Sequence, residues 1–476
     1  MSSITTTVKS IRDIMRKDAG VDGDAQRISQ MVWMLFMKIF ADKEKEWSIT
    51  IEDYESPIPD KLKWQHWAAD EEGMTGEELM DFINNEVFPS LKELDITTSP
   101  QAKIIRSVFE DTYNYMKNGT LFRQVINEIN KINFNKTADR HLFNDIYETI
   151  LKELQSAGSS GEYYTPRAVT QFMVDIINPQ LGETVLDPAC GTGGFLTCTI
   201  EHLRKQATRP TQREKMQNSI RGIEKKPLPH LLCTTNLMLH GFDVPAVSRG
   251  NYLARPYSDW GVKDKVNIIL TNPPFGGTEE DGIETNFPKK FRTKETADLF
   301  LALIIRLLKD NGRAAVVLPD GTLFGEGIKT KLKEELLAKC NLHTIVRLPN
   351  GVFNPYTGIK TNLLFFEKGS PTKAIWYYEH PYPDGTKSYN KTKPIDIKEF
   401  DAEKAWWDKR EESKLAWKVP IKEIIARNYN LDINNPHQET DDLAKPEVLL
   451  GQFRETEQQI HAIQDKIVQV LTEALK

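Results

Sequence analysis

The chain has 476 residues, of which 39% are hydrophobic and 27% charged, a balance typical of a soluble globular protein with about two or three domains. Its formal net charge of −6 excludes a generic polyanion binder, so work on nucleic acid would need a local basic surface or a partner. No apolar run is long enough to span a membrane, and the N-terminus lacks a signal-peptide pattern. The four cysteines form no CxxC pair, which predicts a reduced, cytoplasmic protein without a structural zinc site.

Apolar residues recur at helical spacing throughout residues 1–155 and predict an all-α helical bundle domain. The clearest stripes lie at residues 28–40, 104–109, 121–129 and 142–154. Asp24 is expected to cap the first of these helices. The region contains no catalytic constellation, so we interpret it as a domain for packing or partner contacts.

A flexible stretch at residues 156–161 predicts a domain boundary, and a catalytic domain is expected over residues 156–430. The six residues that follow the boundary are Glu162, Tyr163, Tyr164, Thr165, Pro166 and Arg167. Thr165 is expected to cap a helix whose first residue is Pro166. The two tyrosines beside this cap are candidates to line a pocket.

From Thr184 onward, short apolar strands alternate with helices. Strands are expected at residues 184–187, 220–224, 247–251, 266–271, 314–318, 343–348 and 362–366. One helix between them, over 297–308, is expected to stop at Asn311–Gly312. This βαβα series predicts an α/β fold with a doubly wound, Rossmann-like parallel sheet and antiparallel strands at its end.

The chain after about residue 370 is polar and predicted to be irregular, until a helix returns at residues 446–476. That helix belongs to an expected C-terminal tail, residues 431–476, for subunit contacts. Its apolar residues are spaced like a helix-packing seam interrupted at Glu457. The seam is expected to pack either on the N-terminal bundle of the same chain or on another subunit.

A glycine-rich turn follows the first expected strand. Its residues are Asp187, Pro188, Ala189, Cys190, Gly191, Thr192, Gly193, Gly194 and Phe195. Glycines at this place let the backbone approach a ligand closely at the start of the next helix, although an ordinary tight turn is the alternative. A carboxylate at the strand end would repel a pyrophosphate but suits an ammonium group, which favours S-adenosylmethionine over a dinucleotide. Glu224, at the end of the second strand, is placed to accept both hydroxyls of a ribose.

The strand over residues 266–271 ends abruptly in Asn272, Pro273, Pro274 and Phe275. Neither proline can donate to a ladder, which predicts a stiff turn at the carboxyl end of a strand, where open α/β sheets bind ligands. The Asn272 side-chain oxygen and the Pro273 carbonyl are suited to accept both hydrogens of a planar amine, with Phe275 stacked on its ring. Methyl transfer to such an amine needs acceptors and in-line geometry but no metal. A base in duplex DNA would first have to flip out of the stack.

The loop over residues 276–295 is rich in glycine and charge. Four of its side chains are basic, namely Lys289, Lys290, Arg292 and Lys294. They are candidates to touch phosphate, and a solvated surface loop is the alternative.

Together, the motifs at residues 162–167, 187–195 and 272–275 resemble those of the amino-methylating DNA methyltransferases. Most closely they resemble the modification subunit of bacterial type I restriction–modification systems, and the resemblance covers most of the chain. It implies methyl transfer from S-adenosylmethionine to N6 of adenine in DNA. It also implies a cofactor pocket at residues 162–167, 192–194 and Glu224, with Asp187 nearby, and catalysis by residues 272–275.

The resemblance further implies that two such subunits bind one specificity subunit, and that a translocating nuclease subunit can join them. The sequence agrees, because no sizeable target-recognition domain follows the expected sheet and the net charge is negative. Two other classes remain open at this point. One is an RNA guanine-N2 or protein glutamine methyltransferase, since both use Asn-Pro-Pro-aromatic turns, and the other is a non-catalytic assembly subunit that binds S-adenosylmethionine.

Overall fold

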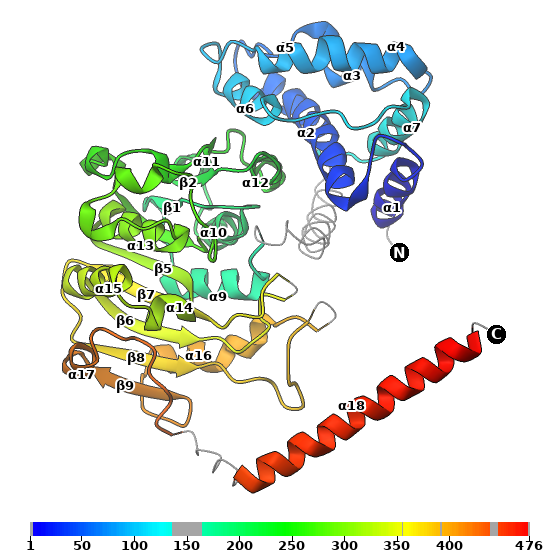
Figure 1. Cartoon of the computed structure of the whole chain (residues 1–476). Helices are drawn as coiled ribbons and strands as arrows, with labels where there is room; N and C mark the ends of the chain where they lie inside the picture. The colour runs from blue at the N-terminus through cyan, green and yellow to red at the C-terminus, as the bar shows by residue number, and fades with distance from the viewer. Residues whose placement is uncertain (1–2, 136–163, 355, 391–392, 438–445, 475–476) are drawn as a thin grey trace.

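The computed structural model describes residues 3–135, 164–354, 356–390, 393–437 and 446–474. A helical N-terminal domain precedes a nine-stranded α/β sheet, and a long helix ends the chain (Figure 1). The predicted fold class is therefore confirmed. Among the described residues, none of the helices combines the length and the apolar character that crossing a membrane requires.

The N-terminal domain is built around α2 (Gly23–Thr50), in which every residue from Gln30 to Glu44, about four turns, is buried. Trp33 of α2 is fully buried, and its ring lies 5.0 Å from Phe88, 6.0 Å from Phe122 and 6.2 Å from Phe109. Around it pack α1 (Ser3–Met15), α3 (Trp64–Trp67), α4 (Gly76–Asp81), α5 (Phe88–Lys92), α6 (Pro100–Phe109) and α7 (Gly119–Asn130).

Three of the four predicted apolar stripes are confirmed by α2, α6 and α7, and the fourth, at residues 142–154, lies outside the described residues. The expected cap at Asp24 is wrong, because α2 begins at Gly23 and Asp22 holds the capping position. Asp24 instead forms an ion pair with Arg27 over 3.0 Å. An acidic residue in the first turn stabilises the helix through its favourable interaction with the helix dipole, without capping the helix.

The strands form one sheet in the order β3-β2-β1-β4-β5-β7-β6-β8-β9. Their bounds are β1 Val185–Asp187, β2 Ile220–Glu224, β3 Val247–Arg249, β4 Val266–Thr271, β5 Leu308–Pro319, β6 Cys340–Arg347, β7 Thr361–Lys368, β8 Ala374–Glu379 and β9 Ala416–Pro420. The first five strands are parallel, and β7 and β9 run antiparallel to their neighbours. The order reverses between β1 and β4, so their carboxyl ends form the topological switch point where such sheets bind ligands.

Helices cover both faces of the sheet (Figure 1). They are α9 (Arg167–Ile177), α10 (Gly194–Arg204), α11 (Pro210–Gln217), α12 (Pro227–Leu239), α13 (Thr296–Leu307), α14 (Asp320–Phe324), α15 (Ile328–Lys339), α16 (Asp401–Trp407) and α17 (Ile421–Ala426). One of them, α12, also contributes Leu231 and Leu232 to the core of the N-terminal domain. Lys43 of α2 pairs with Asp243 over 2.6 Å beside this contact, so the helical domain is fixed against the sheet close to β2 and β3.

Two expectations about the later part of the sheet are wrong. The segment after residue 370 is not wholly irregular, because β8 and β9 extend the sheet and Trp417 stacks on Tyr377 with ring centres 5.3 Å apart. Asn311–Gly312 does not stop a helix, since α13 ends at Leu307 and these residues lie within β5. Asn311 has a φ of 62° there, so its left-handed backbone makes a local irregularity in a strand that begins six residues earlier than expected.

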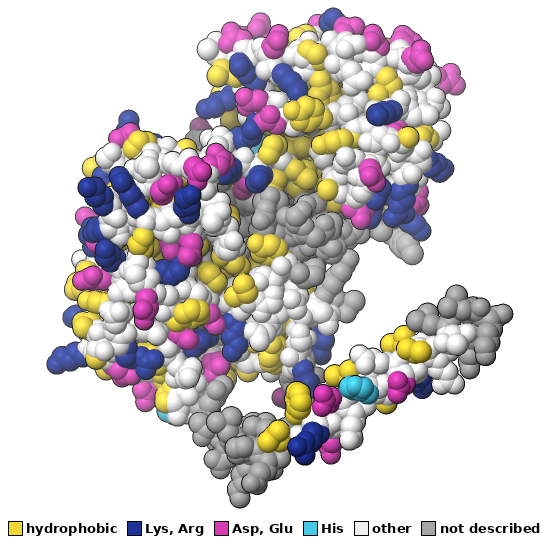
Figure 2. Space-filling model, viewed as in Figure 1, with side chains coloured by type: hydrophobic (Ala, Val, Ile, Leu, Met, Phe, Trp, Pro, Cys, Tyr) yellow, Lys and Arg dark blue, Asp and Glu magenta, His cyan; other side chains and the backbone are white. Residues whose placement is uncertain are grey.

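The C-terminal helix α18 (Pro446–Ala474) confirms the predicted helix. Its apolar side chains lie at the surface (Figure 2), with exposed fractions of 65% for Phe453, 50% for Ile460 and 60% for Ile463. In the structure, therefore, this seam is not buried against the N-terminal bundle, which was one of the two expectations.

Candidate active site

A cavity of about 230 Å³ lies at the switch point, at the carboxyl ends of β1, β2 and β4. It brings together residues that the sequence analysis singled out from four separate segments. These are Thr165, Asp187, Ala189, Gly191, Gly194, Glu224, Asn272 and Pro274. Glu162 and Tyr163 lie outside the described residues.

Asp187 is the most deeply buried ionisable group of the cavity, with 1% of its surface exposed. Its Oδ1 accepts hydrogen bonds from the Thr271 hydroxyl at 2.7 Å and from the Ala189 amide at 3.2 Å. Burial, opposed by these two bonds and assisted by the nearby Glu224 charge, raises the pKa of Asp187 to about 7. Among the described residues, no lysine or arginine forms an ion pair with it. A cationic ligand would supply the missing countercharge.

The glycine-rich turn is held in place by Glu224. One carboxylate oxygen accepts the Gly191 amide at 2.9 Å, and the other accepts the Lys226 amide at 2.7 Å. Gly193 has a φ of 85°, and a Cβ on it would lie 2.7 Å from the Cys233 sulfur. Both observations require glycine at this position, because an added methyl group has no room and the conformation disfavours any side chain. The turn thus brings bare backbone to the cavity wall.

Asn272 presents an unsatisfied acceptor. Its Nδ2 donates to the Thr165 hydroxyl at 3.0 Å, which fixes the amide plane. Its Oδ1 is buried and has no hydrogen-bond partner among the described residues. Leaving a buried carbonyl oxygen unpaired costs about 1–3 kcal/mol, so this oxygen is suited to a ligand that donates an N–H group.

Phe275 continues the same turn, and 8% of its surface is exposed. Its ring lies 6.2 Å from Phe353 and 6.3 Å from Tyr356, in edge-on and tilted arrangements. Both partners belong to the loop between β6 and β7. Neither residue could be predicted from the sequence, because nothing in that loop marks its aromatic residues as neighbours of the Asn272 turn.

Several predicted cofactor residues do not line the cavity. The Arg167 guanidinium donates to the Thr197 hydroxyl at 2.5 Å and pairs with Glu201 of α10 at 3.0 Å. Tyr164 is buried with the core of the N-terminal domain. The Thr192 carbonyl accepts a hydrogen bond from Asn236 of α12 at 3.3 Å. Arg167 and Thr192 thus contact α10 and α12, the helices beside the glycine-rich turn, and do not face the cavity.

The expected capping role of Thr165 is wrong. The helix α9 begins at Arg167, and its capping position is held by Pro166 without a side-chain hydrogen bond. The Thr165 hydroxyl accepts from Asn272 instead. A tertiary hydrogen bond has therefore replaced the local one that the sequence favours.

Glu279 is a further cavity residue that the sequence analysis missed, and its side chain is 8% exposed. It accepts hydrogen bonds from Asn251 at 2.8 Å and Thr296 at 3.2 Å, and it pairs with Lys225 at 3.1 Å. These contacts tie the start of the loop after Phe275 to β2 and α13. Nothing in the sequence distinguishes Glu279 from the other acidic residues of this loop, so its role in anchoring the loop could not be predicted.

The basic residues of the same loop are largely neutralised within the chain. Lys290 pairs with Glu335 at 2.8 Å, and Lys294 pairs with Asp281 at 2.6 Å. Arg292 donates to the Phe287 carbonyl at 3.1 Å. Phosphate contact by this cluster, which the sequence analysis left open, would have to compete with these partners.

Comparison with known proteins agrees with this geometry. A model of the N-6 DNA methylase family matches residues 138–444, and a model of the HsdM N-terminal domain matches residues 4–129. The methylase subunit of the type I restriction enzyme EcoEI from Escherichia coli is 57% identical, over 99% of this chain and 98% of that protein.

Solved structures agree as well. A crystal structure of a type I modification subunit from Vibrio vulnificus YJ016 is 46% identical, with a TM-score of 0.82 over 91% of this chain and 96% of that one. A chain from a structural study of type I complex assembly is 34% identical, with a TM-score of 0.83 over 99% of each chain.

This family membership decides against the RNA guanine-N2 and protein glutamine methyltransferases, and against a non-catalytic subunit. The chain belongs to the methylase subunits of type I restriction enzymes, which are adenine-specific N6 DNA methyltransferases.

Proposed function

We propose that the cavity at the carboxyl ends of β1, β2 and β4 binds S-adenosylmethionine, and that residues 272–275 hold the N6 amine of a flipped adenine beside it. The observation that carries the proposal is that, among the described residues, Asn272 Oδ1 has no hydrogen-bond partner and the buried Asp187 in the same cavity has no cationic partner. The Asn272 oxygen can accept a hydrogen bond from an N–H donor, and the Asp187 carboxylate can pair with a cation.

The residues of the cavity fit the cofactor's three chemical parts. Asp187 would pair with the ammonium group, and the carboxylate of Glu224 would accept ribose hydroxyls in addition to the amides that it already holds. The bare backbone of Gly191 and Gly194 would allow close approach. When bound, the cofactor supplies an electrophilic methyl group on its sulfonium sulfur.

The Asn272 turn would orient the second substrate. Its Oδ1 would accept one N–H of the adenine amine and the Pro273 carbonyl the other, which directs the nitrogen lone pair toward the methyl group. As the nitrogen gains positive charge, these two acceptors would stabilise it more strongly than they stabilise the neutral amine. Phe275, braced by Phe353 and Tyr356, would pack against the base.

Two ligands separate the proposed role of Asp187 from general damage to the fold. Asp187→Asn should weaken binding of S-adenosylmethionine to the chain at pH 8. It should leave binding of 5′-methylthioadenosine nearly unchanged, because that ligand lacks the ammonium group. Equal losses for both ligands would contradict the pairing.

Asn272→Ala tests the catalytic role. With the specificity subunit present, the variant should lose at least about 100-fold in the methylation rate, the loss that follows removal of one group that stabilises transition-state charge. Binding of S-adenosylmethionine should persist. Unchanged methylation would refute the assignment of this turn.

The subunit contacts are a second part of the proposal. The apolar seam of α18 would join the specificity subunit, with two copies of this chain per specificity subunit, and a nuclease and translocase subunit would join that complex. The exposed Phe453, Ile460 and Ile463 support this, because a terminal helix gains stability by burying such a face. Removing residues 446–476 should abolish co-purification with the specificity subunit. Retained co-purification would show that α18 is not needed for this contact. The domain limits 1–155, 156–430 and 431–476 stay part of this proposal.

A further inference from the structure

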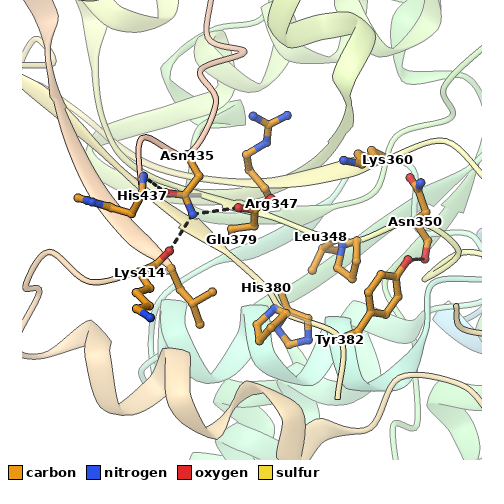
Figure 3. A pocket seen from close by; sticks show the side chains of 13 residues that line it. Arg347, Leu348, Asn350, Lys360, Glu379, His380, Tyr382, Lys414, Asn435 and His437 are labelled. Atoms are coloured by element: carbon orange, nitrogen blue, oxygen red, sulfur yellow. Dashed lines mark hydrogen bonds between the residues drawn. The ribbon is translucent and has the colours of Figure 1, made fainter. Parts of the chain in front are cut away.

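A second cavity, of about 590 Å³, opens on the same edge of the sheet as the proposed methylation site. It lies at the carboxyl ends of β6 and β8 and at the starts of the antiparallel β7 and β9. The side chains that matter are Arg347, Asn350, Lys360, Glu379, Tyr382 and Lys414 (Figure 3). None of them takes part in the proposed methyl transfer, and together they form what we term the flanking groove.

The charge of the flanking groove is positive. Arg347 is neutralised by Asp432 at 2.7 Å, so the charged groups left in the lining are Lys360, Lys414 and the carboxylate of Glu379, which accepts a hydrogen bond from Asn435 at 3.1 Å. Lys360 and Lys414 are both exposed, and neither forms an ion pair with any of the residues that the structure describes. They stand in contrast to Lys290 and Lys294 of the loop after Phe275, whose charges are already paired.

The two lysines lie at the same edge of the sheet as Asn272, at successively greater distances from it. The strand order from the methylation site outward is β4, β5, β7, β6, β8, β9. At about 4.8 Å per strand, Lys360 just before β7 lies about 10 Å along the edge, and Lys414 just before β9 lies about 24 Å along it. The interval of about 14 Å spans about four base steps of 3.4 Å. The groove therefore has the position and the length to follow DNA beside a flipped base.

We propose that the flanking groove binds the phosphodiester backbone of the duplex on one side of the target adenine, with Lys360 and Lys414 each contacting a phosphate. The inference rests on the proposed function, because it takes Asn272 as the place where the flipped base arrives. Lysine acts as a flexible point charge, which suits phosphate contacts that carry no sequence information. Such contacts position DNA for an enzyme whose net charge is −6, while a partner selects the sequence.

The chain offers a matched control on the opposite edge of the same sheet. A cavity of about 360 Å³ at the start of β8 is also basic and also carries two exposed lysines, Lys373 and Lys418. It lies toward the opposite edge from Asn272, because Lys373 precedes β8 and Lys418 of the antiparallel β9 pairs with Trp376 in the first half of β8. Removing Lys373 and Lys418 changes the net charge by the same two units as removing Lys360 and Lys414, but away from the edge where the flipped base is proposed to bind.

The experiment uses the full chain in complex with the specificity subunit and a duplex that carries its target. Binding is measured over a range of salt concentrations for the wild type, for Lys360→Ala/Lys414→Ala and for Lys373→Ala/Lys418→Ala. Loss of two phosphate contacts should make the slope of log affinity against log salt shallower by about 1.8 for each copy that touches DNA. The KM for DNA should rise roughly tenfold at 150 mM salt, with the rate at saturating DNA and the affinity for S-adenosylmethionine unchanged.

Two further outcomes make the test decisive. Lys360→Arg/Lys414→Arg should restore the wild-type slope, because it keeps both charges, and the control pair should keep that slope as well. An unchanged slope in Lys360→Ala/Lys414→Ala would overturn the proposal. Loss of the complex with the specificity subunit in size-exclusion chromatography would also overturn it, since the groove would then be a protein interface. If the wild-type complex does not methylate, the proposed function fails instead.

Discussion

Cofactor binding should depend on pH through Asp187. Its raised pKa of about 7 means that the free site is largely protonated below neutrality, whereas an ammonium ligand needs the carboxylate. The ionised fraction falls to about a tenth at pH 6 and to about a thirtieth at pH 5.5. The affinity for S-adenosylmethionine should therefore fall roughly tenfold between pH 8 and pH 6, with release of a proton on binding in that range.

Isothermal titration at several pH values, in buffers of different ionisation enthalpy, measures both the affinity and the proton release. Asp187→Asn is the control, because it removes this titration while leaving that of the ligand in place. Its affinity should be low and nearly independent of pH from 6 to 8. Glu224→Gln should move the midpoint to lower pH, since the Glu224 charge helps to raise the pKa of Asp187. Equal pH profiles for the wild type and Asp187→Asn would refute the reasoning.

The same shift has a consequence for the free protein. The folded-state pKa of about 7 exceeds the ordinary value of 3.8, so the stabilising effect of the proton is complete below pH 3.8 and is lost as the pH rises through 7. The difference corresponds to at most about 4 kcal/mol. Asp187→Asn should therefore raise the free energy of unfolding at pH 8, with a smaller gain at pH 5. Denaturant titrations at the two pH values measure this, and a loss at pH 8 would contradict it.

Two further predictions concern the cavity wall. Gly193→Ala should lower the free energy of unfolding by at least about 1 kcal/mol, because its Cβ would meet the Cys233 sulfur at 2.7 Å in a strained conformation. Adding Cys233→Ala should recover only part of that loss, because it relieves the clash but not the backbone strain. Additive effects of the two substitutions in a double-mutant cycle would contradict the clash. Glu279→Ala should release the loop from Lys225 and raise the amide exchange rates of residues 276–282, whereas unchanged exchange would show that other contacts hold the loop.

The sequence allowed Asp187, Glu224 and Asn272 to be placed in one cavity, because each lies at or just after the end of a parallel strand. The carboxyl ends of parallel strands meet at one edge, so these residues could be placed together without knowing any contact. Thr165 was misjudged because a local capping preference was outweighed by the hydrogen bond from Asn272. Local patterns do not reveal which tertiary partner will compete.

The far side of the sheet was harder to predict. Trp376 and Trp417 lie in short strands without clear apolar alternation, and pairing between β8 and β9 joins segments about 40 residues apart. The flanking groove depends on this pairing, because Lys360 and Lys414 come together only once β6 to β9 are in place. Glu279 and Tyr356 show the same limit, since both reach the site from loops with no motif of their own.

The rate of N6-methyladenine formation in a single turnover tests the central claim most directly. The wild-type chain and Asn272→Ala would each be combined with the specificity subunit and loaded with S-adenosylmethionine before DNA is added, so that binding does not limit the rate. We expect Asn272→Ala to be slower by about two orders of magnitude, because it lacks the acceptor for the amine. We also expect a smaller loss for Thr165→Val, which frees the Asn272 amide but keeps its Oδ1. A wild-type rate in Asn272→Ala would show that Asn272 does not take part in methyl transfer.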